Sequence, residues 1–212
     1  MADLRRSWRA TYSTAVMLVL LTVAAEAAER PAGGRNVGID MRFGELVREA
    51  SQQYHKKNYA QAVALYTEAL EMRPDRKNAF VLYNYRGYAH TDAQNHSAAV
   101  ADFDAALRMR PADSSTLNQA AWLRATSREP AARNGKLAVQ QATRACELTN
   151  WKDSDLIDTL AAAHAEAGDF AQAMEYQKQA IRLAPLADRN NMHKRLALFQ
   201  QRTPYRLNAK GR

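Results

Sequence analysis

The feature of this sequence that most constrains its fold is a ladder of small and aromatic residues that recurs along the chain. One copy begins at Gly87 and continues at Ala99, Phe103, Ala106 and Pro111. Small side chains at these intervals allow two antiparallel helices to approach closely, and the aromatic side chain fills the space beside the pair. Proline ends the second helix because its ring cannot continue the hydrogen-bond pattern. The ladder therefore predicts a pair of packed α-helices.

Three further copies of this ladder begin at Ala50, Ala121 and Ala161, so the helix pair is a repeated unit. The copies end at residues 74, 111, 150 and 185, which are 37, 39 and 35 residues apart. A single pair cannot bury its own apolar face, and the stacking of successive pairs supplies the core. Gly and Pro are scarce, at 8 and 6 of the 212 residues, which favours helices. The predicted fold class is all-α: an α-solenoid of four helix-turn-helix pairs with a C-terminal capping helix.

The segment from Gly168 to Ala173, followed by Ala180 and Pro185, resembles the tetratricopeptide repeat. The resemblance covers about two-thirds of the chain and implies repeats at about 42–74, 78–111, 114–150 and 153–185. Several segments, together with the ending Thr203–Arg206, are similar to a recurring bacterial, exported subtype of these repeats. Those segments are Ala121–Leu123, Arg133–Lys136, Ala145–Thr149 and Asp158–Ala163.

Two repeats depart from the common ladder. The third has five extra residues around Ser127–Ala131, carries Ala142 where an aromatic residue is expected, and ends at Asn150 rather than proline. The fourth carries Gln177 at the aromatic position, with Tyr176 beside it as a possible substitute. These departures affect the expected stacking angle rather than the fold class.

Residues 1–27 are predicted to be a signal peptide. Three arginines precede an apolar run at Val16–Leu21, and Ala25-Glu26-Ala27 has the small-residue spacing of a cleavage site. The alternative is an uncleaved membrane anchor over residues 10–25, although a span needs about 20 mostly apolar residues. Residues 28–41 are predicted to be a flexible linker. Export makes a periplasmic or secreted location the expected one.

Residues 186–212 are predicted to hold a capping helix at 188–202 and a basic tail. Met192, Leu196 and Phe199 are expected to cover the open end of the stack, and the residues after Pro204 to be loose. His193, Lys194, Arg195 and Arg202 are expected to face water. This segment carries seven Lys or Arg against one Asp, so it holds most of the net charge of +8. A nucleic-acid binder usually has its basic stripe on the folded surface, so no nucleic-acid partner is expected.

No constellation of residues predicts catalysis, a cofactor, a metal or a small-molecule substrate. The five histidines lack the spacing of a helical metal pair. Asp153, Asp155 and Asp158 are expected to be helix N-terminal charges, with Asp153 or Ser154 as the cap; a calcium site is the alternative. The lone Cys146 is expected to be a buried apolar residue, with a reactive thiol as the alternative. The chain is predicted not to be an enzyme.

In tetratricopeptide arrays the first helices line a concave groove that takes a peptide or helix, and the resemblance implies the same here. The ladder register assigns to this groove Asn118, Trp122, Ala125 and Thr126 of the third repeat and Asp158, Ala162, Ala165 and Glu166 of the fourth. The six residues chosen as the partner-binding groove are Tyr54, Asn84, Tyr88, Asn118, Trp122 and Asp158.

These groove residues suggest the chemistry of the ligand. An amide at Asn84 or Asn118 could bond a ligand backbone, and Tyr88 and Trp122 are either binding anchors or core residues. The acidic Asp158 and Glu166 suggest a partly apolar ligand with a basic end. The expected function is a non-enzymatic scaffold that binds a protein or peptide partner. The alternative is a membrane-tethered structural subunit of an envelope complex, with membrane contact only if the N-terminal segment stays uncleaved.

Overall fold

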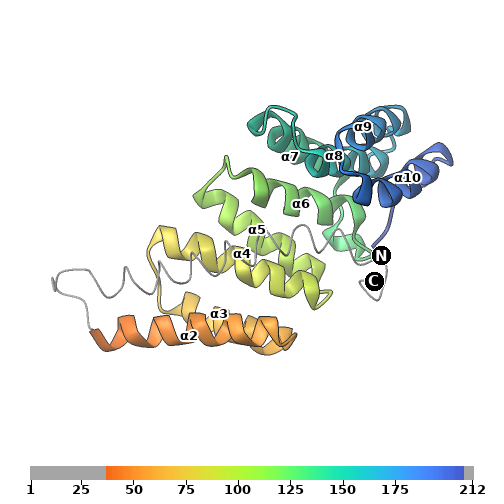
Figure 1. The fold of residues 1–212 in the computed structure, drawn as a ribbon. Helices are drawn as coiled ribbons and strands as arrows, with labels where there is room; N and C mark the ends of the chain where they lie inside the picture. Colours follow the sequence, from red (N-terminus) through yellow and green to blue (C-terminus); the bar gives the residue numbers. More distant parts are fainter. Residues whose placement is uncertain (1–36, 208–212) are drawn as a thin grey trace.

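The computed structural model describes residues 37–207, with side chains from residue 41 onward. Within that part of the chain the secondary structure is helical and contains no strand (Figure 1). The helices are α2 (Val37–His55), α3 (Tyr59–Glu71), α4 (Arg76–Asp92), α5 (His96–Met109), α6 (Ser114–Thr126), the 3-10 helix η1 (Pro130–Ala132), α7 (Gly135–Leu148), α8 (Ser154–Glu166), α9 (Phe170–Leu183) and α10 (Leu186–Gln200).

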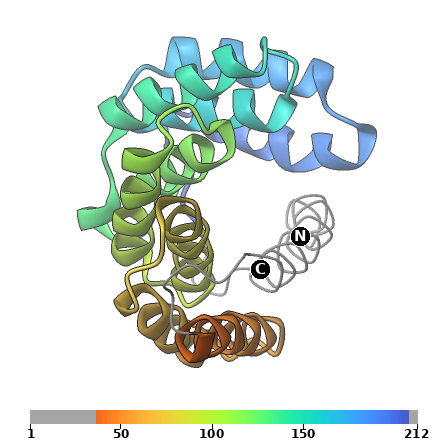
Figure 2. The same ribbon diagram turned by 90° about the vertical axis from the view of Figure 1, so that its left-hand side faces the viewer.

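Each helix packs against the next one along the chain, so that α2–α3, α4–α5, α6–α7 and α8–α9 form four pairs. The pairs stack side by side into a curved array, and α10 covers the end of the last pair (Figure 2). The first helices of the third and fourth pairs, α6 and α8, also pack against each other. The prediction of an all-α solenoid is confirmed. The concave side of this arc is called the inner face below.

The ladder residues lie where the helices meet. The first rung is buried in all four pairs, and the aromatic rung is filled by Tyr66 and Phe103 in the first two. At Gly87 the contact is so close that an added Cβ would lie 2.8 Å from Cε1 of Phe103. The small rungs buried without any exposed surface are Ala50, Ala62, Ala69, Ala99, Ala106, Ala121, Ala138, Ala145, Ala161, Ala173 and Ala180. Small side chains at these rungs therefore set the distance between helices.

The turns inside three of the pairs share one backbone design. The second residue after the first helix is left-handed, at φ 65° for Lys57, 67° for Gln94 and 86° for Gly168. The next amide then donates to a carbonyl five residues earlier, as from Asn95 to His90 at 2.8 Å. This bond satisfies a carbonyl that the helix end would leave open. The common geometry gives these three pairs the same sharp reversal.

Two boundaries differ from those expected from the sequence. The helix α2 begins at Val37, inside the segment 28–41 that was expected to be a flexible linker. The capping helix α10 spans Leu186–Gln200 rather than 188–202, and it buries Met192 and Phe199 completely, as predicted. The predicted signal peptide, residues 1–27, lies outside the described residues. No helix of residues 37–207 has both the length and the apolar character that crossing a membrane requires.

Candidate protein-binding face

Asp158 is buried in an ion pair rather than open to a ligand. The guanidinium of Arg195 on α10 donates from Nε to Asp158 Oδ1 at 2.9 Å and places Nη2 2.7 Å from Oδ2. Gln177 Nε2 donates to the same carboxylate at 2.6 Å. Arg195 is 3% exposed, so the expectation that it faces water is wrong: a buried acid on α8 requires a buried cation, and the capping helix supplies it. This contact fixes α10 to the fourth pair.

The two asparagines proposed to bond a ligand are buried as well. Asn84 Nδ2 donates to the carbonyl of Phe80 at 2.9 Å, and its Oδ1 lies 2.8 Å from Thr116 Oγ1 on α6. The Asn84 amide thus joins the second and third pairs. Asn118 is 2% exposed, and its Oδ1 has no hydrogen-bond partner within the described part of the chain. Burial of both amides leaves the aromatic residues as the more accessible of the predicted groove residues.

Tyr54 and Tyr88 lie toward the N-terminal half of the array. The Tyr54 hydroxyl donates to Asp92 Oδ2 on α4 at 2.7 Å, which links the first pair to the second. Tyr88 packs edge-on against Phe103, with ring centroids 5.4 Å apart. Both side chains are half-buried, so each combines a packing contact with an accessible surface.

Trp122 on α6 is covered in part by the C-terminal residues of the chain itself. Its ring lies 5.8 Å from the ring of Tyr205, and the Arg195 guanidinium lies 5.6 Å from the centroid of each. The residues after Pro204 were expected to be loose. That expectation is wrong for residues 205–207, because each of them contacts the helices. Trp122, Asp158, Arg195 and Tyr205 therefore form one connected cluster.

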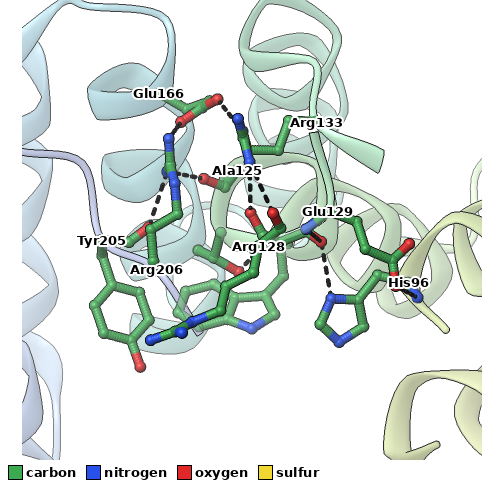
Figure 3. A network of polar contacts seen from close by, with 11 residues as sticks. His96, Ala125, Arg128, Glu129, Arg133, Glu166, Tyr205 and Arg206 are labelled. Atoms are coloured by element: carbon green, nitrogen blue, oxygen red, sulfur yellow. Dashed lines mark hydrogen bonds and ion pairs between the residues drawn. The ribbon is translucent and has the colours of Figure 1, made fainter. Parts of the chain in front are cut away.

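Arg206 and Leu207 contact the C-terminal ends of α6 and α8. Arg206 Nη2 lies 2.5 Å from Glu166 Oε2, and its Nη1 donates to the carbonyl of Ala125 at 3.2 Å (Figure 3). The Leu207 amide donates to the carbonyl of Thr126 at 2.9 Å. The last carbonyls of a helix lack partners within the helix and carry partial negative charge, which favours a cation. The segment thus supplies hydrogen-bond donors to the carbonyls of Ala125 and Thr126 at the end of α6.

The extra residues of the third repeat connect its neighbours on both sides. The Glu129 carboxylate accepts from the amides of His96 and Ser97 at 3.0 and 2.9 Å, at the start of α5. Asn95, the N-cap of α5, makes no side-chain cap hydrogen bond, so Glu129 serves instead. On the other side Arg133 Nε donates to Glu166 Oε1 at 3.0 Å. Figure 3 shows Glu166 between Arg133 and Arg206.

Two ionisable groups of this connection have shifted pKa values. Burial lowers the pKa of His96, and the charge of Glu129 opposes this only in part. For Glu129, burial raises the pKa, but hydrogen bonds from Ser97 and His96 and the charge of His96 outweigh it, so the net pKa is lowered. His96 Nδ1 lies 2.8 Å from Ser127 Oγ. Burial thus favours the neutral form of His96, and the hydrogen bonds from His96 and Ser97 favour the charged form of Glu129.

Other ionisable residues fill structural roles. Asp153 caps α8, accepting from the amide of Asp155 at 2.9 Å, as predicted. Cys146 is completely buried, as predicted, and burial raises the pKa of its thiol to about 12. No group of three or more His, Cys, Asp or Glu residues that could hold a metal occurs in the described part of the chain.

Sequence reasoning missed the residues that complete this face: Arg128, Glu129, Arg133, Arg195, Tyr205 and Arg206. One signal was available, because the ladder register assigns the acidic Glu166 to the groove. The basic tail contains the opposite charge in Arg206, and the aromatic Tyr205 precedes it. The separation of about 40 residues between them hides this pairing from any local pattern.

The comparisons with known proteins agree with this architecture. No curated protein matches the chain. Residues 155–184, which span α8, its turn and α9, match the family model of the tetratricopeptide repeat. The fourth helix pair is therefore similar to a tetratricopeptide repeat, and this match, within a stack of four such pairs, supports a tetratricopeptide-repeat protein.

Proposed function

We propose that this chain is a non-enzymatic interaction module that binds a segment of another protein on its inner face. Tetratricopeptide repeats generally mediate contacts between proteins, and the matched residues form one. The observation that supports the proposal is the contact of Tyr205–Leu207 with α6 and α8, because a segment that is neither helix nor strand lies against this surface. Backbone hydrogen bonds hold such a segment regardless of its sequence, and side-chain contacts select it.

A partner on this face should contact the accessible aromatic residues of the first helices. The test introduces a photoreactive phenylalanine analogue at Tyr54 or Tyr88 in the full chain, followed by irradiation in an extract of the producing cell. We expect the same crosslinked protein from both positions. Matched analogues at the exposed Ala64 of α3 and Ala101 of α5, on second helices, should not yield it. Equal crosslinking from all four positions would reject the inner face as the binding surface.

We further propose that the chain is exported, to the periplasm or the exterior of the cell, as the N-terminal sequence predicts. The alternative is a membrane-tethered structural subunit held by residues 10–25, whose run at Val16–Leu21 is apolar. Mass spectrometry of the mature protein separates the two. A chain beginning at Glu26 or Ala28 supports export with cleavage, and an intact chain beginning at Met1 in the membrane fraction supports the tether.

A further inference from the structure

The end of the described chain binds its own inner face with the features of a peptide ligand. The surface that it covers, called the tail site, consists of Trp122, Ala125, Thr126, Arg128 and Glu166. Four of these five residues, all except Arg128, occupy positions that the ladder register assigns to a ligand groove. The tail site is therefore part of the predicted binding surface, occupied from within the molecule.

Two hydrogen bonds hold the backbone of Leu207 in the tail site. The Leu207 amide donates to the Thr126 carbonyl at 2.9 Å, and Arg128 Nε donates to the Leu207 carbonyl at 2.5 Å. The backbone amide and the carbonyl of Leu207 thus both form hydrogen bonds with the tail site. Any peptide backbone could make these two bonds, so they do not select a sequence.

Side-chain contacts supply the selectivity. Tyr205 lies against Trp122, and Arg206 faces the Glu166 carboxylate and the end of α6. Leu207 packs against the buried cluster that contains Phe103 and Leu123. An aromatic, a cationic and an aliphatic side chain in succession therefore match three neighbouring subsites. Glu166 fixes the middle one, because its charge favours arginine there and disfavours an acidic residue.

The segment lies outside the helix pairs. Tyr205, Arg206 and Leu207 are each half-buried and follow the last helix, so their detachment would leave every helix pair in place. Four residues separate Gln200, the end of α10, from Tyr205. Such a short connection favours binding within the same molecule over exchange with a second copy.

We propose that Tyr205–Leu207 is a resident ligand of the tail site, and that the partner segment presents the same aromatic–arginine–aliphatic chemistry and must displace it. The proposal rests on the function proposed above and defines its ligand. A site occupied by its resident ligand for nine-tenths of the time binds an external one about tenfold more weakly than an open site. The tail thereby sets a threshold for partner binding.

The test uses a fluorescent peptide with the sequence of residues 201–207 and full-length chains. In Arg206→Glu the resident arginine becomes a carboxylate facing Glu166, which opens the tail site. We expect fluorescence anisotropy to report binding at least about tenfold tighter to Arg206→Glu than to the parent. Lys194→Glu, the same charge change at an exposed position of α10, should behave as the parent. A peptide with glutamate in place of Arg206 should bind neither chain.

A second measurement uses the parent chain alone, so it does not depend on the folding of a variant. Saturating unlabelled peptide should accelerate deuterium uptake by the segment that contains Leu207, because the amide loses its bond to Thr126. Equal affinity for the parent and Arg206→Glu, or unchanged uptake at saturation, would overturn the proposal and leave the tail as a fixed structural element. Dimers of the parent in light scattering that dissociate on adding peptide would also overturn it, in favour of exchanged tails. Crosslinking from Tyr54 and Tyr88 to one partner would keep the proposed function in each of these cases.

Discussion

Arg195 on the last helix forms a two-point ion pair with Asp158 on α8, and both side chains are 3% exposed. The two residues lie 37 positions apart in the sequence, and their contact links the capping helix to the interior of the fourth repeat. Breaking a buried pair by removing one partner is costly because the other charge stays buried and unpaired.

Arg195→Met should therefore lower the free energy of unfolding by about 3–5 kcal/mol. Asp158→Asn combined with Arg195→Met should cost less than the sum of the two single changes, because no charge is then left alone. Urea denaturation followed by circular dichroism measures all three. Lys178→Met, which removes the exposed pair with Glu175, is the control and should unfold as the parent does. Strict additivity of the two buried changes would contradict the assigned coupling.

Gly87→Ala should destabilise the second pair by about 1–3 kcal/mol through overpacking. The added methyl group would lie 2.8 Å from Cε1 of Phe103, whose ring is completely buried. Gly44→Ala in α2 is the matched control, because no atom lies within 4 Å of its added Cβ. There alanine should stabilise the helix by up to about 1 kcal/mol. The melting temperatures of the two variants should shift in opposite directions relative to the parent. A shift in the same direction would refute the close contact.

Acidification should destabilise the fold from about pH 6.5 downward. Burial lowers the pKa of His90, His96 and His164 below the usual 6.5. The unfolded chain then binds protons more readily than the folded one, so stability is complete above pH 6.5 and is lost as the pH falls through the folded pKa values. His96→Gln should flatten this decline in a melting-temperature series from pH 7.5 to 5.5. His193→Gln, on the exposed side of α10, should leave the curve of the parent unchanged.

Glu129→Ala should weaken the start of α5 by about 0.5–2 kcal/mol, the usual contribution of a helix cap. The loss removes the acceptor of the His96 and Ser97 amides and of the Ser97 hydroxyl. Deuterium uptake should rise first at residues 96–100. Glu129→Gln keeps an acceptor without the charge, so its deuterium uptake at residues 96–100 should lie between those of the parent and of Glu129→Ala. Glu147→Ala, which removes an exposed carboxylate paired with Arg144, should leave uptake at α5 as in the parent.

The repeat architecture was predictable because the residues that determine it lie close together in sequence. Ala50 and Ala161 each lie 12 residues before the next small residue of the ladder, and each is completely buried as the ladder requires. The end of the third repeat also has a local cause: Asn150 adopts φ 52°, a left-handed conformation that asparagine tolerates better than most residues. The spacing of residues close together in the sequence was thus sufficient to predict the helix pairs.

The candidate site was only partly predictable. Trp122 and Glu166 were assigned to the groove from register alone, and both contact the terminal segment. Arg195 and Arg206 were missed because an arginine on a helix or in a tail has the same local pattern whether it faces water or a buried acid. Only the packing of residues distant in the sequence distinguishes the two outcomes.

The loop of the third repeat limits how freely this array can be rearranged. Through Glu129 it completes α5 of the preceding unit, and through Arg133 it contacts Glu166 of the following one. Replacing the third unit by a consensus repeat without this loop would leave open amides at the start of α5 and would remove Arg133, one of the two arginines that contact Glu166. The third repeat therefore cannot be exchanged without changing contacts in the second and fourth repeats.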